Sequence, residues 1–159
     1  MSRRLMYLIG LALIAVLAGC AQGVTVPAPP EIRYGEDVCV GCNMIISDER
    51  YASAYAYEIE TGRFESLPFD DIGGMVGYAK KHPDHNVVRW WVHDYNTKEW
   101  IDATTAFYMA SDDLQTPMGF GVAAFAQQAD AEAFAAELGG VVLAWEEARE
   151  HMTASPGGM

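Results

Sequence analysis

The amino-acid sequence predicts an α+β fold in which two related modules of the order strand, strand, helix, strand lie side by side. Two helical segments have apolar residues at helix spacing, and each is preceded by a pair of segments typical of strands. Each helical segment is followed by one more apolar, β-branched segment. The same order therefore occurs twice with little residue identity, and this pattern is typical of a duplicated module.

The first module begins with a strand over residues 51–59 (YASAYAYEI), in which aromatic or small residues alternate. A turn at Thr61-Gly62 leads to a return strand over residues 63–67. The helix comes next, and its apolar stripe has the spacing i, i+3, i+4 and i+7: Ile72, Met75, Val76 and Ala79. Residues 87–93 (VVRWWVH) are apolar, β-branched and aromatic, which predicts a central closing strand.

The ends of this helix carry residues that helix ends favour. Asp70 and Asp71 lie at the N-terminus, where the helix dipole favours negative charge. Lys80 and Lys81 suit the negative C-terminal end, and Pro83 ends the helix because it cannot continue the backbone hydrogen bonds. We therefore interpret both aspartates as helix caps.

The second module repeats the order. Residues 103–110 and 119–126 are the two strand candidates. The helix again has apolar residues at i, i+3, i+4 and i+7: Ala131, Phe134, Ala135 and Leu138. Gly139 is expected to cap its C-terminus. Residues 141–145 (VVLAW) predict the closing strand, and residues 145–151 a short terminal helix.

The N-terminus predicts export. A basic start, an apolar run over residues 5–16 and small residues before a cleavage point describe a signal peptide. The run is shorter than the about 20 residues that span a membrane. Leu17-Ala18-Gly19-Cys20 resembles a bacterial lipoprotein signal, in which the cysteine becomes the lipidated first residue. We expect a signal peptide over residues 1–19 and a lipid on Cys20; a buried N-terminal helix with an unmodified cysteine is the alternative.

Composition then divides the rest of the chain. Residues 20–36 are proline-rich, which favours an extended tether between the lipid and the folded part. The first module is placed at residues 37–97, the second at 98–152, and a flexible tail at 153–159. The net charge of −12 argues against nucleic-acid binding, which needs a basic face. Membrane attachment would therefore rest on the lipid.

The motif CVGCNM, residues 39–44, holds two thiols and a thioether. A disulfide between Cys39 and Cys42 is one interpretation, because exported thiols usually oxidise, although so short a loop adds little stability. A zinc site normally needs four ligands, and we interpret His82 and His85, beside lysines, as solvated surface residues. A redox pair would need the cysteines to open a helix after a buried strand, whereas this context favours a loop and a short strand.

Copper(I) is the interpretation that also uses Met44. Side chains two residues apart share a face of an extended segment, so Cys42 and Met44 present two sulfur atoms together. Thiolate and thioether ligands select Cu(I) over harder ions. Met118, in the turn TPMG, is the candidate third sulfur, although an ordinary core methionine is an equal interpretation of this residue type. Met75 lies on the apolar helix stripe, so we expect it to pack in the core.

Several of these segments together resemble one known family. They are Cys39-x-x-Cys42-x-Met44-x-Ile46-x-Asp48, Phe69-Asp70-Asp71-Ile72-Gly73, Trp100-Ile101-Asp102-Ala103, Tyr108 and Thr116-Pro117-Met118-Gly119. Over residues 37–145 they are similar to the NosL family of nitrous-oxide reductase accessory lipoproteins. The resemblance implies a Cu(I)-binding chaperone with two related ββαβ modules. Asn43 stands where the family usually has glycine, and Gly74 where members often have cysteine.

The sequence thus predicts a membrane-anchored Cu(I) carrier and not an enzyme. We expect Cys42 as the thiolate ligand, Met44 and Met118 as thioether ligands, and Cys39 as an auxiliary ligand. The sulfur atoms of Met44 and Met118 are expected within about 4 to 8 Å of each other and of that of Cys42. The expected acceptor is nitrous-oxide reductase or its membrane assembly complex; a homodimer stays open. The carrier would face the periplasm, or the outer surface of a single-membraned cell. The alternative function is an exported thiol-disulfide oxidoreductase using both cysteines.

Overall fold

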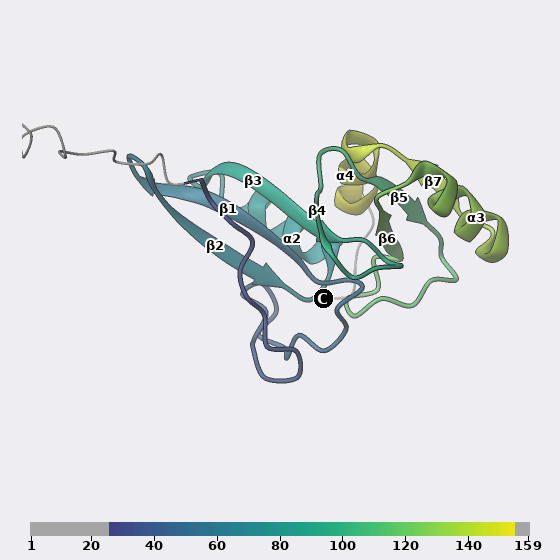
Figure 1. Cartoon of the computed structure of the whole chain (residues 1–159), viewed down its shortest axis with the longest axis horizontal. Coiled ribbons are helices and arrows are strands. Elements are labelled where there is room, and N and C mark those ends of the chain that lie inside the picture. The colour runs from purple at the N-terminus through teal and green to yellow at the C-terminus, as the bar shows by residue number, and fades with distance from the viewer. Residues whose placement is uncertain (1–25, 155–159) are drawn as a thin grey trace, which may run out of the picture.

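Two antiparallel β-sheets and three helices make up residues 26–154, which the computed structural model describes (Figure 1). One sheet has four strands in the order β2-β1-β3-β4, and the other has three in the order β6-β5-β7. The strands are β1 (Ser53–Glu60), β2 (Arg63–Phe69), β3 (Asn86–His93), β4 (Trp100–Asp102), β5 (Phe107–Ala110), β6 (Val122–Phe125) and β7 (Val141–Leu143). The helices are α2 (Ile72–Lys81), α3 (Gln128–Leu138) and α4 (Trp145–Ala154). The α+β prediction is confirmed.

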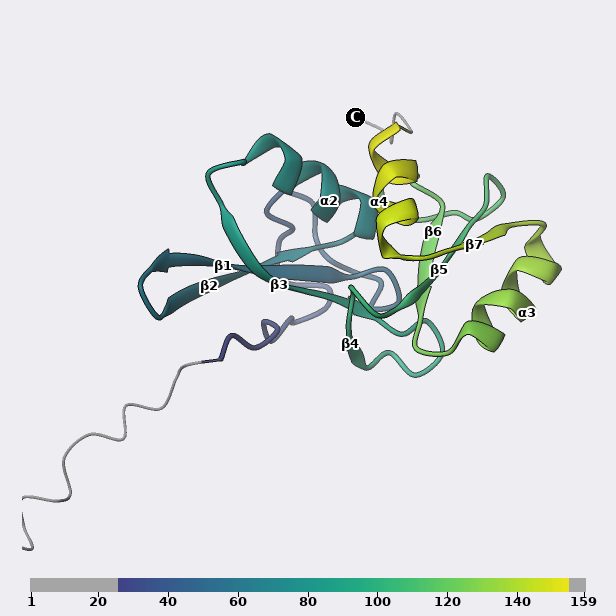
Figure 2. The same cartoon turned by 90° about the horizontal axis from the view of Figure 1, so that it is seen from above.

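The first sheet forms as the alternation of its residues predicts. Glu60 pairs with Arg63 around the turn at Thr61-Gly62, where Gly62 has a φ of 72° that suits a residue without a side chain. Strand β1 pairs with β2 on one side and with β3 on the other. Helix α2 lies over one face of this sheet, with helix α4 next to it (Figure 2). The predicted order strand, strand, helix, strand is therefore present.

The second sheet has the same order, and all three of its strands are shorter than predicted. Strand β5 lies between β6 and β7. Strand β7 ends at Leu143, and Trp145 begins α4, because the Glu147 side chain accepts a hydrogen bond from the backbone of Ala144 (2.9 Å) and starts the helix there. Helix α3 ends at Gly139, which has a φ of 71°.

Strand β4 pairs with β3 in the first sheet, although the division at residue 98 assigns it to the second module. The reason is a tight turn over residues 94–99. The backbone N–H of Lys98 donates to the carbonyl of Asp94 (2.8 Å), and that of Asp94 donates to the carbonyl of Glu99 (2.9 Å). This turn returns the chain antiparallel to β3 before it crosses to the second sheet.

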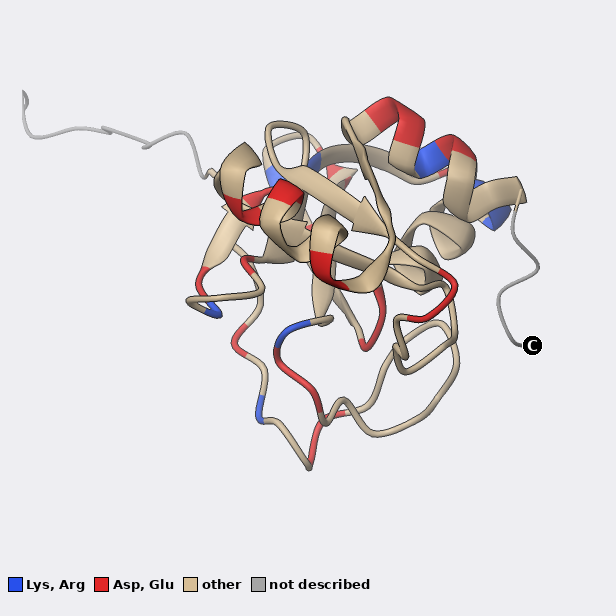
Figure 3. Ribbon diagram, turned by 90° about the vertical axis from the view of Figure 1, so that its right-hand side faces the viewer, with Lys and Arg blue, Asp and Glu red and all other residues tan. Residues whose placement is uncertain are grey.

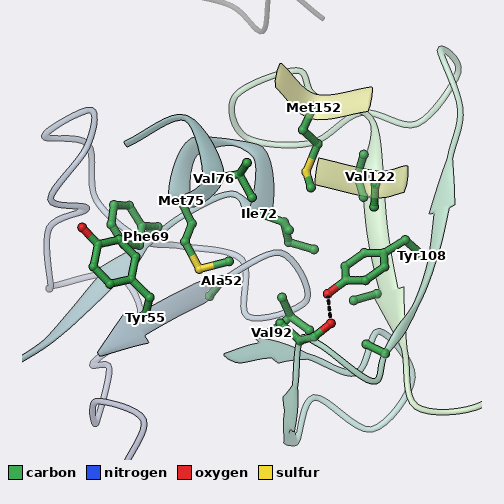
Figure 4. Packing of buried hydrophobic residues seen from close by; sticks show 14 of the residues in the cluster. Ala52, Tyr55, Phe69, Ile72, Met75, Val76, Val92, Tyr108, Val122 and Met152 are labelled. Atoms are coloured by element: carbon green, nitrogen blue, oxygen red, sulfur yellow. Dashed lines mark hydrogen bonds between the residues drawn. The ribbon is translucent and has the colours of Figure 1, made fainter. Parts of the chain in front are cut away.

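One hydrophobic core joins the two modules (Figure 4). Ile72, Met75 and Val76 point from α2 onto the first sheet, which confirms the predicted apolar stripe and the packing of Met75. Tyr108 on β5 and Met152 on α4 belong to the same cluster. The Tyr108 hydroxyl donates to the carbonyl of Ala103 (2.6 Å), so this buried polar group has its partner. The modules are therefore packed as one body.

The described part of the predicted tether lies against the folded part. The Ser66 side chain donates to the carbonyl of Ala28 (2.8 Å), and the Tyr34 hydroxyl lies 2.8 Å from Nε2 of the buried His93. Ile32 and Tyr34 pack against the main core, which explains why this segment does not stand away from the domain. The predicted signal peptide and the Cys20 lipidation site lie outside the described residues.

The surface carries more carboxylates than cations. Figure 3 shows Asp and Glu along the helices and loops, with few Lys and Arg between them.

At the C-terminus, α4 continues through Ala154, beyond the predicted start of the tail at residue 153. Between residues 26 and 154, every helix is too short or too polar to cross a membrane.

Candidate metal centre

The CVGCNM segment folds into a tight loop before β1. The backbone N–H of Cys39 donates to the carbonyl of Met44 (2.8 Å), and that of Asn43 donates to the carbonyl of Cys39 (3.0 Å). Asn43 has a φ of 62°, a left-handed conformation that asparagine tolerates better than most residues other than glycine. The departure from the family's glycine therefore leaves the local turn intact. The N–H of Val40 donates to the carbonyl of Pro68 (3.1 Å), which fixes the loop to β2.

The three sulfur atoms of this loop differ in exposure. Cys39 is buried, with 2% of its surface exposed; Cys42 is half-buried; and Met44 is 51% exposed. Both cysteines are thiols. Burial raises the pKa of the Cys39 thiol to about 12, because the low-dielectric surroundings disfavour the thiolate. Cys42 is thus the more accessible cysteine, and Met44 is the most exposed of the three residues.

Asp70 faces the thiols instead of capping the helix. The Cys42 thiol lies 3.5 Å and 3.6 Å from the two carboxylate oxygens of Asp70, whose surface is only 2% exposed. One ligand atom from each of Cys39, Cys42 and Asp70 lies within 4.8 Å of the others. Sequence reasoning missed this role, because it assigned both aspartates to the helix end. The available signal was the pair itself, since only one residue can occupy the N-cap.

Asp71 is the N-cap of α2 and also connects the two modules. Its carboxylate accepts a hydrogen bond from the backbone N–H of Gly73 (2.9 Å). Its Oδ2 also accepts from the Thr116 hydroxyl (2.6 Å) and from the backbone N–H of Met118 (2.9 Å). Burial raises the pKa of the Asp71 carboxyl, and these three hydrogen bonds act in the opposite direction. The turn that carries Met118 is therefore held at the N-terminus of α2.

A pocket of about 790 Å³ lies where the loop, α2 and this turn meet. All four predicted sulfur residues line it: Cys39, Cys42, Met44 and Met118. Met118 is half-buried and does not lie on the far side of its module. The structure therefore brings the predicted residues to one pocket, and their assignment as ligands stays a prediction.

Helix α2 presents glycines to this pocket. Gly73, Gly74 and Gly77 all line it. A Cβ on Gly73 would lie 2.1 Å from Cγ of Phe120, so the Phe120 ring packs directly on the helix backbone. This close approach explains the glycine at position 73.

Sequence comparison adds to this geometry. The sequence model of the family described as NosL matches residues 32–153. The chain belongs to the NosL family. A NosL relative, the copper-binding lipoprotein NosL of Stutzerimonas stutzeri, is 31% identical over 143 residues, which cover 82% of this chain and 73% of that protein. The crystal structure of the copper chaperone NosL from Shewanella denitrificans has a similar fold, with a TM-score of 0.64 at 19% identity, covering 77% of this chain and 96% of that one.

Proposed function

We propose that this protein carries Cu(I) and supplies it for assembly of the copper centres of nitrous-oxide reductase, without being an enzyme itself. The observation that carries the proposal is the pocket into which two thiols and two thioethers gather from separate parts of the chain. Soft sulfur ligands of both kinds favour Cu(I) over zinc and harder ions. The names of the two relatives, one copper-binding and one a copper chaperone, support the same cargo.

Cys42 is the anchor of the proposed site. When Cu(I) binds, the sulfur–hydrogen bond of this thiol is replaced by a sulfur–copper bond, and one proton leaves. The Asp70 carboxylate, 3.5 Å from the sulfur, is placed to accept that proton and pass it to water. Burial raises the pKa of the Cys39 thiol to about 12, which disfavours its thiolate in the metal-free protein, so we assign it an auxiliary role.

Met44 and Met118 are the proposed neutral ligands. Thioethers need no deprotonation, and their exchange changes no charge at the metal. Because Met44 is 51% exposed, an acceptor's ligand can approach copper at this position while Cys42 still holds it. Copper would then pass through a shared intermediate to the reductase or to its membrane assembly complex. The lipid proposed on Cys20 would keep the carrier at the membrane, facing the periplasm or the outer surface.

An anaerobic Cu(I) titration of the mature protein in detergent micelles, in competition with a Cu(I) chelator, tests this proposal. We expect one tightly bound Cu(I) per chain and much weaker zinc binding. Loss of a group that only orients a metal ligand typically lowers metal affinity roughly 10- to 100-fold. Because Cys42 is the proposed direct ligand, Cys42→Ser should lower the Cu(I) affinity by more than about 100-fold. Met44→Leu and Met118→Leu should weaken it less, and each clearly more than the core control Met75→Leu, which nearly conserves volume. A larger effect of Met75→Leu than of both other leucine variants would place the site elsewhere.

The same variants distinguish a carrier from a thiol-disulfide oxidoreductase. A redox enzyme of this type attacks with a thiolate of lowered pKa, usually at a helix N-terminus. Here both cysteines lie in a loop, and the pKa of Cys39 is raised. A redox enzyme would need both cysteines and tolerate Met44→Leu, so disulfide reductase activity that survives this change while Cu(I) affinity is unaffected would favour the enzyme.

A further inference from the structure

The turn after α2 holds two histidines in a defined arrangement. The backbone N–H of His85 donates to the carbonyl of His82 (3.0 Å), and Pro83 occupies the second position of this turn, which its fixed φ favours. Both histidine side chains are half-buried, and their rings lie 5.0 Å apart at 24°. Their interpretation as solvated surface residues is therefore incomplete.

Aromatic rings hold both imidazoles in place. The ring of Tyr78 stacks on His82 at 4.1 Å, and that of Tyr57 stacks on His85 at 3.9 Å. The Tyr55 hydroxyl lies 2.6 Å from Nδ1 of His85. A hydrogen bond to one ring nitrogen leaves the other nitrogen to bind, and metal-ligating histidines are commonly oriented in this way.

Asp84 completes a ligand set. One ligand atom from each of His82, Asp84 and His85 lies within 4.8 Å of the others. From this geometry we propose a second metal site, formed by these three residues, for a divalent ion of the Zn²⁺ or Cu²⁺ type. Two imidazole nitrogens and a carboxylate oxygen suit such ions, and the set has no sulfur to favour Cu(I). Three protein ligands leave positions for water.

The surroundings make this site distinct from the sulfur pocket but adjacent to it. His82 lines both the sulfur pocket and a second pocket of about 500 Å³ between α2, β3 and α4. Glu146 and Glu150 line the second pocket and favour a cation. Lys80 and Arg149 line it too and act against one. The opposing charges place the expected affinity below that of a closed four-ligand zinc site.

The experiment removes the thiols first, so its outcome does not depend on the proposed Cu(I) function. The mature chain with Cys39→Ser and Cys42→Ser is titrated with Zn²⁺ by equilibrium dialysis and with Cu²⁺ by electron paramagnetic resonance. We expect one Zn²⁺ per chain, and one Cu²⁺ whose spectrum shows coupling to two imidazole nitrogens. In this background, His82→Asn with His85→Asn should abolish both, whereas the matched change His151→Asn on α4 should leave both intact.

Two further variants keep the test decisive if the double change unfolds the protein. Asp84 is exposed, so Asp84→Asn should weaken binding without altering the melting temperature of the metal-free protein. Tyr55→Phe keeps the ring and removes the hydroxyl, and should weaken binding roughly 10- to 100-fold. Absence of a stoichiometric ion in the thiol-free chain, or equal losses in His151→Asn, would overturn the proposal.

Discussion

Helices α2 and α3 occupy the same place in their modules, yet only α2 takes part in the pocket. The N-cap of α2 is Asp71, whose carboxylate accepts from the helix backbone, whereas the N-cap of α3 is Gln127, which makes no such bond. Gly73, Gly74 and Gly77 turn the backbone of α2 to the pocket, while α3 is built from alanine and other good helix formers. A repeated scaffold can therefore form a pocket at one helix while the matching helix only supports its sheet.

The difference has a cost in stability. Each glycine within a helix is less favourable than alanine by about 0.8 to 1 kcal/mol, so α2 is the weaker helix by intrinsic propensity. Its attachment must come from elsewhere, namely the buried side chains of Ile72 and Met75 and the hydrogen bonds of Asp71. Helix α3 depends far less on its N-cap side chain. Substitutions at matching positions of the two helices can therefore test the comparison.

The largest effect is expected at the N-caps. Asp71→Ala removes the cap and leaves the Thr116 hydroxyl and the Met118 N–H without their partner. We expect a loss of about 2 to 4 kcal/mol in the free energy of unfolding, and weaker Cu(I) binding because the Met118 turn is released. Gln127→Ala, the matched change, should stay within about 0.5 kcal/mol. Denaturant unfolding measures both, and equal losses would contradict the comparison.

A smaller effect is expected in the first turn of each helix, at its second residue. Alanine normally stabilises a helix relative to glycine, but a Cβ at Gly73 would meet the Phe120 ring. Gly73→Ala should therefore destabilise by about 1 to 3 kcal/mol through overpacking. Ala129 holds the matching position in α3 and is exposed, so Ala129→Gly should cost no more than about 1 kcal/mol. Thermal melts of both variants provide the measurement; a stabilised Gly73→Ala would show that the ring does not pack there.

The smallest effect is expected at the helix C-termini, where α3 ends in a left-handed residue and α2 does not. Gly139 has a φ of 71°, whereas His82 at the end of α2 has a φ of −119°. Gly139→Ala should cost about 1 kcal/mol because a Cβ is strained in the left-handed region. It should leave Cu(I) affinity unchanged, since α3 does not line the pocket. A loss of copper binding in this variant would mean that α3 supports the site although none of its residues lines the pocket.

The order of elements could be predicted from the sequence because side-chain periodicity reports burial. Ile72, Met75 and Val76 lie on the buried face of α2, as their spacing predicts. The pairing of β4 with β3 could not be predicted, because a three-residue strand has too little alternation to show its sheet. Trp145 was expected both to end the closing strand and to begin the terminal helix. It begins the helix, and the strand ends at Leu143, since apolar residues at an element boundary fit either neighbour.

The candidate site was only partly predictable. Cys39, Cys42 and Met44 could be grouped because they are close in the sequence. Their soft sulfur ligands indicated Cu(I) as the metal. The proximity of Met118 to the same pocket depends on Asp71 accepting from a turn of the other module, a contact between distant segments that local patterns do not encode. The different roles of Asp70 and Asp71 likewise depend on the folded backbone. It directs the Asp70 carboxylate to the cysteine loop and the Asp71 carboxylate to the helix N-terminus.

The glycines of α2 leave room for further side chains in the pocket. A Cβ built on Gly74 would meet only Cβ of Asp71 and Cγ of Met118, both at 3.9 Å, an ordinary contact distance. A side chain can therefore be added at this position without moving the core. Gly77 has open space at the same distance. The set of side chains that line this pocket can thus be extended one residue at a time, because the helix has room for a Cβ at both positions.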